Sequence, residues 1–238
     1  MISRCKKRQK VKKLLIWDFD GVIADSEYLW VQAWDEVLKS EKQIKLSIKE
    51  KHDLLYGVSD KTRRERLEKH ISGLNLDNDF MKKIHKREFE LGTDFMAPMP
   101  GVESVMQNKN FEHCIATGAT REQHNFKMIP RFHFVKKYIP DQNVFTVDMV
   151  EQGKPAPDLF LLAAKTKGYT SQNCIVVGDS VNDFKAATAA GMDAVAFIGA
   201  TGNNTKKYET ECKKHGVFGI SNTMNNLNVL LNEWHKSR

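Results

Sequence analysis

The stretch LLIWDFDGVI at residues 14–23 places two carboxylates, Asp18 and Asp20, at the end of an apolar run. A run of this kind is typical of a central strand in a parallel sheet, which is covered on both faces. Like charges held close together raise each other's pKa unless something compensates. Magnesium is the simplest compensator, because it takes carboxylate oxygens and keeps positions for water and a substrate phosphate. The stretch therefore predicts a buried strand that ends at a metal site.

Short apolar segments recur later in the chain and alternate with helix-like segments. Strand-like runs occupy residues 113–117, 144–147, 174–178 and 194–198. Segments with helical spacing lie between them, for example residues 157–167 and residues 181–190, the second of which is followed by Gly191. Such alternation predicts an α/β fold with a doubly wound parallel sheet and helices on both faces.

Residues 26–98 interrupt this alternation. The segment is rich in charge and in helix formers, and it ends at APMPG, residues 97–101, where two prolines and a glycine stop any helix. We therefore expect an all-helical cap at residues 27–97, inserted into a catalytic core made of residues 13–26 and 98–238. The chain would cross between the two near Ser26 and again near residues 99–100.

Composition narrows the class of protein. The chain has 238 residues, of which 41% are hydrophobic and 28% are charged, and no apolar stretch reaches the length of a membrane span. Four cysteines lie scattered without a CxxC pair, which argues against a zinc site or a disulfide framework. We expect a cytoplasmic monomer that does not bind membranes.

The net charge of +7 comes from one end of the chain. Residues 1–13 hold seven Lys and Arg and no acid, and the rest of the chain holds 30 Lys and Arg against 30 Asp and Glu. The folded part is therefore neutral, and no nucleic-acid partner is expected. We interpret residues 1–12 as a basic, disordered tail exposed to solvent.

Polar residues follow several of the predicted strands. Thr117 and Gly118 end one of them, Lys154 lies in the loop GKPAPD, and Asp179 and Asp183 lie in GDSVND after another. Each has an ordinary explanation alone, such as a helix cap or a surface charge. Because ligands bind at the carboxyl ends of strands in an open parallel sheet, their shared position predicts a pocket for a metal and a phosphate.

These motifs, taken together, resemble those of the haloacid dehalogenase superfamily. The four motifs of that family are represented by DFDGV at residues 18–22, Thr117-Gly118, Lys154, and GDSVND at residues 178–183. The resemblance runs from about residue 13 to near the C-terminus and implies a Rossmann-like core. The insertion matches the helical cap of the subgroup that includes β-phosphoglucomutase and phosphoglycolate phosphatase.

The resemblance implies a role for each motif residue. Asp18 would be the nucleophile that forms an aspartyl-phosphate, and Asp20 would be the general acid and base. Thr117, Gly118 and Lys154 would hold the phosphoryl oxygens, with Thr117 and Lys154 counted among the catalytic residues.

The same resemblance implies a magnesium ion. Its ligands would be Asp18, the backbone carbonyl of Asp20, and Asp179, with Asp183 as an outer-shell partner. The ion would let an anionic nucleophile approach an anionic phosphate.

The resemblance leaves three functions open. Asp20 is absent from family dehalogenases, so its presence favours phosphoryl transfer. Gly57, Val58 and Ser59 in the cap are similar to the substrate-contacting loop of β-phosphoglucomutase, but Trp30 stands where that enzyme has an acid/base histidine. We therefore expect a magnesium-dependent phosphatase of a small phosphorylated metabolite, for example a sugar phosphate. The alternatives are a phosphomutase and, ranked lower, a non-catalytic binding or regulatory protein.

Overall fold

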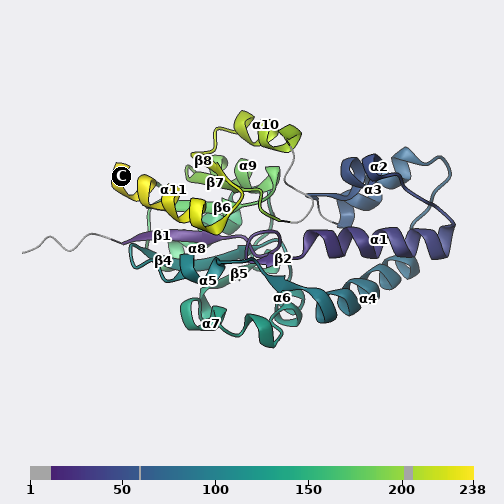
Figure 1. Ribbon diagram of the computed structural model, residues 1–238, viewed down its shortest axis with the longest axis horizontal. Coiled ribbons are helices and arrows are strands. Elements are labelled where there is room, and N and C mark those ends of the chain that lie inside the picture. The colour runs from purple at the N-terminus through teal and green to yellow at the C-terminus, as the bar shows by residue number, and fades with distance from the viewer. Residues whose placement is uncertain (1–11, 59, 201–205) are drawn as a thin grey trace, which may run out of the picture.

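The computed structural model describes residues 12–58, 60–200 and 206–238 (Figure 1). The predicted tail at residues 1–12 lies outside the described residues except for Lys12. Ser59, which we expected in a specificity loop, also lies outside them. Within the described residues, no helix is both long enough and apolar enough to cross a membrane.

A six-stranded parallel sheet forms the core, and its strand order is β5-β4-β1-β6-β7-β8. The strand that contains residues 14–17 is therefore central, with Leu15 paired to His113 on one side and to Ile175 on the other. The predicted doubly wound α/β fold is confirmed. The strands are β1 (Lys13–Trp17), β4 (Phe111–Thr117), β5 (Val144–Thr146), β6 (Cys174–Gly178), β7 (Asp193–Phe197) and β8 (Gly219–Ser221).

The side chains of β1 explain the two helical layers. Leu15 and Trp17 pack into one hydrophobic cluster, whereas Leu14 and Ile16 pack into the other, because alternate side chains point to opposite faces of a sheet. All four are fully buried. Each aliphatic side chain of this kind contributes roughly 1.5–3 kcal/mol by leaving water.

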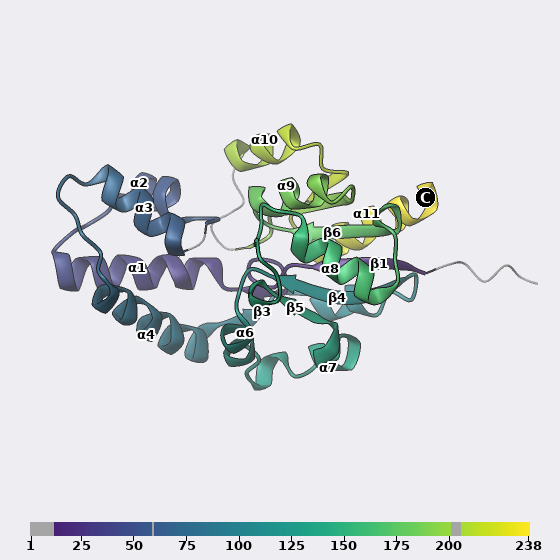
Figure 2. The same cartoon turned by 180° about the vertical axis from the view of Figure 1, so that it is seen from behind.

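Helices cover both faces of the sheet (Figure 2). α5 and α11 share one hydrophobic cluster with β1, while α8 and α9 share the other. The core helices are α5 (Val102–Met106), α6 (Arg121–Lys127), α7 (Val135–Tyr138), α8 (Asp158–Lys167), α9 (Val181–Ala189), α10 (Lys206–Lys214) and α11 (Met224–Ser237), with short 3₁₀ turns at η1 (Pro130–Phe132), η2 (Asp141–Asn143), η3 (Val147–Met149) and η4 (Ser171–Asn173).

The inserted segment forms a helical cap at one end of the long axis of the molecule (Figure 1). It has its own hydrophobic cluster, built around Trp34, Leu55, Leu67 and Ile84. Asp77 is the N-cap of the last cap helix: its Oδ1 accepts a hydrogen bond of 2.8 Å from the backbone N–H of Phe80. The cap helices are α1 (Glu27–Lys42), α2 (Ile48–Leu55), α3 (Asp60–His70) and α4 (Asn78–Phe95).

The chain enters and leaves the cap through a short antiparallel ribbon. Strand β2 (Ala24–Asp25) pairs with β3 (Ala97–Pro98). We propose that this ribbon marks the boundary between the core, residues 13–26 and 98–238, and the cap, residues 27–97.

Some details differ from the predicted elements. The strand expected at residues 194–198 lies at Asp193–Phe197, and the one expected at residues 113–117 begins two residues earlier. Sequence reasoning missed β8, because three residues with one fully buried side chain give too short a pattern. It also missed the ribbon of β2 and β3, whose strands have two residues each.

Candidate active site

Asp18 follows β1 directly and is buried at the carboxyl end of the sheet. Its backbone N–H donates to the carbonyl of Val177 at 2.9 Å, which continues the pairing with the next strand. Gly21 then turns the chain with φ +71°. A Cβ on Gly21 would lie 1.9 Å from Oδ2 of Asp179, so only glycine fits this close approach.

Lys154 is the cation that faces the nucleophile candidate. Its Nζ lies 2.9 Å from Oδ1 of Asp18 and 2.6 Å from Oδ1 of Asp183. The lysine side chain is only 8% exposed, so little solvent screens these pairs. The loop after β5 thus places one ammonium group between two acidic motifs that are far apart in the sequence.

Three buried carboxylates, Asp18, Asp179 and Asp183, converge next to Lys154. One oxygen from each lies within 4.8 Å of the others. Burial raises the pKa of Asp18 to about 7, with Asp183 and Asp20 adding to it and Lys154 opposing it. Burial also raises the pKa of Asp179, and the nearby acids raise it further. A set of hard carboxylate oxygens that carries this electrostatic cost fits a divalent cation such as magnesium.

Thr117 ends β4 beside this cluster and is 1% exposed. Its Oγ1 accepts a hydrogen bond from the backbone N–H of Ala119 at 3.1 Å. Because the hydroxyl oxygen is used as an acceptor, its proton is available for donation to a ligand. Thr117 and Gly118 both line the cavity that contains Asp18.

Asp20 points to a different set of partners. Lys127 Nζ lies 2.5 Å from its Oδ2, and its Oδ1 accepts from Ser26 Oγ at 2.8 Å and from Trp30 Nε1 at 3.3 Å. Burial alone would raise the pKa of Asp20, but Lys127 and the hydrogen bonds lower it below its usual range. The side chain of Asp20 is therefore separate from the carboxylate cluster and is held as a carboxylate.

Sequence reasoning missed two of these partners. Trp30 is buried, and its indole N–H donates to Asp20, a contact that its sequence position does not indicate. Lys127 lies at the last position of α6, 107 residues from Asp20, and no motif marks it. The only available signal was its place in the helix after Thr117-Gly118.

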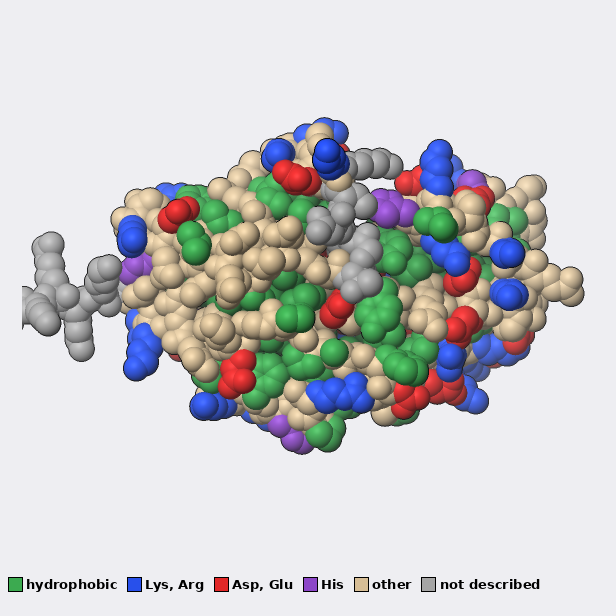
Figure 3. Space-filling view, in the orientation of Figure 1, with side chains coloured by type: hydrophobic (Ala, Val, Ile, Leu, Met, Phe, Trp, Pro, Cys, Tyr) green, Lys and Arg blue, Asp and Glu red, His purple; other side chains and the backbone are tan. Residues whose placement is uncertain are grey.

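A cavity of about 930 Å³ joins the core motifs to the cap. Gly57 and Val58 of the predicted specificity loop line it, as do Trp30 and Lys127. On the face drawn in Figure 3, basic and acidic side chains are interspersed over the cap, rather than gathered into patches of one sign. The core side of the cavity includes Asp18, Asp20, Thr117, Gly118, Lys154, Asp179 and Asp183, and the cap side includes Glu27, Trp30, Gly57, Val58, Asp60, Lys61, Arg63, His85, Glu88 and Phe89.

A doubly wound sheet with a helical insertion and acidic motifs at its strand ends is the architecture of the haloacid dehalogenase-like hydrolases. The model of that family matches residues 15–197. The chain therefore belongs to the haloacid dehalogenase-like hydrolase family, as its motifs indicated.

Characterised relatives and solved structures agree with this assignment. The chain is 26% identical over 187 residues to a phosphorylated carbohydrates phosphatase of Thermotoga maritima, covering 76% of this chain and 82% of the relative. It is 29% identical over 190 residues to a fructose-1-phosphate phosphatase of Escherichia coli, covering 76% and 94%. A haloacid dehalogenase-like protein of unknown function from Agrobacterium tumefaciens has the same fold, with a TM-score of 0.82, 22% identity, and coverage of 94% of this chain and 99% of that one.

Proposed function

We propose that the chain is a magnesium-dependent phosphatase that hydrolyses a small phosphorylated metabolite through an aspartyl-phosphate on Asp18. The observation that carries this proposal is the separation of two carboxylates in one cavity. Asp18 faces Lys154 and the acidic cluster, whereas Asp20 faces Lys127, Ser26 and Trp30. Two carboxylates with different surroundings suit two different chemical roles.

In the first half of the reaction, a carboxylate oxygen of Asp18 attacks phosphorus, and the bond from phosphorus to the ester oxygen breaks. The leaving oxygen takes a proton from the carboxyl form of Asp20, which the negative charge of the bound phosphate favours over the carboxylate that Lys127 holds in the free enzyme. Lys154 and the hydroxyl of Thr117 hold the phosphoryl oxygens, and Gly118 offers a backbone N–H without a side chain in the way. The product alcohol leaves, and Asp18 carries the phosphoryl group.

In the second half, water attacks the phosphorus of the aspartyl-phosphate. Asp20, now a carboxylate, takes a proton from that water, and the bond between Asp18 and phosphorus breaks. Inorganic phosphate leaves, and both carboxylates return to their starting states. The contact with Lys127 favours the carboxylate form of Asp20 that this half requires.

The metal would be held by Asp18, the backbone carbonyl of Asp20, and Asp179, with Asp183 in the outer shell. When bound, magnesium supplies positive charge that offsets the phosphate and orients it toward the nucleophile. The clustering of Asp18, Asp179 and Asp183 supports this assignment.

The substrate class follows from the relatives and the cavity together. Relatives that cover most of this chain are named for phosphorylated carbohydrates and for fructose 1-phosphate. A cavity of about 930 Å³ has room for a sugar phosphate. We propose a phosphorylated carbohydrate as the substrate and Gly57, Val58 and Ser59 as part of its cap contact; Ser59 lies outside the described residues.

The geometry favours hydrolysis over phosphomutase activity. Trp30 occupies the position at which a mutase would need an acid/base side chain, and its N–H donates to Asp20 at 3.3 Å. An indole N–H cannot take a proton from a sugar hydroxyl. Water is therefore the better acceptor for the phosphoryl group.

A direct test measures phosphate release from sugar phosphates, phosphoglycolate and nucleotides, with magnesium and with a chelator. We expect turnover of a sugar phosphate that requires magnesium, and a loss of at least about 10³-fold in Asp18→Asn. The same assay with a bisphosphate added detects isomerised sugar phosphate if the enzyme is a mutase. Turnover that is unchanged in Asp18→Asn would rule out the proposed nucleophile.

A further inference from the structure

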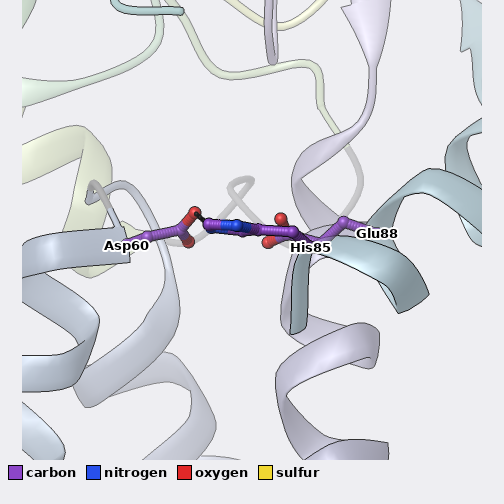
Figure 4. Close-up of side chains that lie close together, drawn as sticks. All are labelled: Asp60, His85 and Glu88. Atoms are coloured by element: carbon purple, nitrogen blue, oxygen red, sulfur yellow. Dashed lines mark ion pairs between the residues drawn. The ribbon is translucent and has the colours of Figure 1, made fainter. Parts of the chain in front are cut away.

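The cap end of the cavity contains a second group of ionisable side chains, Asp60, His85 and Glu88 (Figure 4). Asp60 is the first residue of α3, and the other two lie three positions apart on α4, so they share a face of that helix. One ligand atom from each lies within 4.8 Å of the others. All three line the cavity that also contains Asp18.

Asp60 is fixed in place by its neighbours. Its Oδ1 accepts from Trp34 Nε1 at 3.1 Å and from Arg63 Nη1 at 2.9 Å. Its Oδ2 lies 3.6 Å from His85 Nε2. Although burial alone would raise the pKa of Asp60, the contacts with His85 and Arg63 hold it well below the usual range. Asp60 is therefore an ionised, oriented acceptor, and it turns Nε2 of His85 toward itself.

Glu88 is the member of the group with unused hydrogen-bonding capacity. It is partly buried, and among the described residues no hydrogen bond or ion pair involves its carboxyl group. Burial raises the pKa of Glu88 to about 8, and the charge of Asp60 adds to this. Near neutral pH the group is available both as a donor and as an acceptor for a ligand hydroxyl.

Arg63 is a buried cation of the cap, and it already forms ion pairs within the protein. Arg63 is 4% exposed; it pairs with Glu27 at 3.1 Å and with Asp60, and its Nε donates to the carbonyl of Leu55 at 2.7 Å. A second phosphate or a carboxylate placed here would meet the carboxylates of Glu27 and Asp60 and would be repelled. Uncharged hydroxyl groups can instead donate to these carboxylates.

We propose that Asp60, His85 and Glu88 bind hydroxyl groups of the leaving alcohol and so select the phosphate monoester of an uncharged polyhydroxyl compound. This inference rests on the proposed phosphatase function and names the residues that choose its substrate. The core motifs hold the single phosphate, and the cap group contacts the other end of the molecule.

Two other ligands would use the same region less well. A metal ion would compete with Arg63, whose guanidinium contacts Asp60, and would need the histidine nitrogen that already faces Asp60. A second anion would have to rely on Lys61, an exposed side chain that lines the same cavity. Both alternatives give distinct results in the experiment below.

The experiment compares kcat/KM for a hexitol monophosphate, a hexose bisphosphate, phosphoglycolate and p-nitrophenyl phosphate, which has no hydroxyl group. We expect the wild type to prefer the hexitol monophosphate. Glu88→Leu should lower the ratio of kcat/KM for hexitol monophosphate to that for p-nitrophenyl phosphate about tenfold, and Glu88→Gln should lower it less, because an amide keeps hydrogen-bonding groups. Glu65→Leu, an exposed site on α3 that does not line the cavity, is the matched control and should keep the wild-type ratio.

A binding measurement separates this inference from the proposed function. Calorimetric titration of Asp18→Asn with the hexitol monophosphate reports binding without turnover, and adding Glu88→Leu should weaken that binding about tenfold. If Glu88→Leu leaves binding unchanged, the inference is overturned even if the enzyme is a phosphatase. If Glu88→Leu weakens binding but the wild-type protein does not turn the compound over, only the phosphatase assignment is overturned. Two further results would overturn the inference. One is a preference for the bisphosphate that is lost in Lys61→Ala, and the other is binding of Zn²⁺ that is lost in Glu88→Gln.

Discussion

The two ends of the cavity hold their charges in different ways. At the core end, Lys154 lies between Asp18 and Asp183. Asp18 follows a strand, Lys154 lies in the loop after β5, and Asp183 lies in the first turn of the helix that follows β6. At the cap end, Arg63 lies between Glu27 and Asp60, and all three come from helices. The comparison indicates that the sheet fixes the chemistry of the phosphate, while helix packing in the cap determines what the rest of the substrate meets.

Removing the cation at the core end should have the largest effect. Lys154→Met leaves the buried carboxylates of Asp18 and Asp183 without their cation, so we expect a loss of about 3–5 kcal/mol in the free energy of unfolding and loss of activity. Urea denaturation measures the first, and phosphate release measures the second. Millimolar magnesium should restore part of the lost stability, because it returns positive charge to the carboxylate cluster.

Lys167→Met is the matched control for this change. Lys167 pairs with Glu112 at 2.5 Å, but the glutamate side chain is 39% exposed and the pair lies away from the cavity. We expect a loss below about 1 kcal/mol and normal activity. Equal losses in the two variants would mean that the core end is held together no more tightly than the surface.

Lys127 tests the junction between the two ends. It pairs with Asp20 at 2.5 Å, and its Nζ lies 5.2 Å from the centroid of the Trp30 ring. Lys127→Met should misplace Asp20 and lower kcat about tenfold, with partial recovery in Lys127→Arg. Because p-nitrophenolate leaves without needing a proton, the loss should be larger for a sugar phosphate than for p-nitrophenyl phosphate. An equal loss for both substrates would show that Lys127 does not act through Asp20.

The same contrast explains what could be predicted from the sequence. Asp18 follows β1 and Thr117 is the last residue of β4. These two strands are neighbours in the sheet, and backbone pairing brings such strand ends together whatever the helices do. The fold class was therefore accessible from short apolar runs, and so were the candidate residues at their ends. The positions of these residues then follow from one regular structure.

The contacts of the cap and the junction could not be predicted in this way. The pairing of Lys127 with Asp20 depends on where α6 places its last residue relative to the loop after β1, and that of Arg63 with Glu27 depends on how α3 packs against α1. Charged residues at helical spacing usually face solvent, and the sequence of α3 gives no sign that Arg63 is buried. Packing between helices has no short sequence pattern comparable to a strand end.

The smallest expected effect concerns Glu88 and pH. Its folded-state pKa is raised to about 8, above the ordinary value of 4.5, so the folded protein holds a proton that the unfolded chain releases. Stability should therefore fall as the pH rises from about 4.5 to 8. Glu88→Gln removes this ionisation, and we expect it to stabilise the protein at pH 8 by on the order of 2 kcal/mol while changing little at pH 4.5. Urea denaturation of both proteins at the two pH values measures this difference in stability. An equal change at both pH values would mean that Glu88 ionises as freely in the folded cap as in the unfolded chain. In that case there would be no reason to regard the cap end as a site that favours uncharged groups.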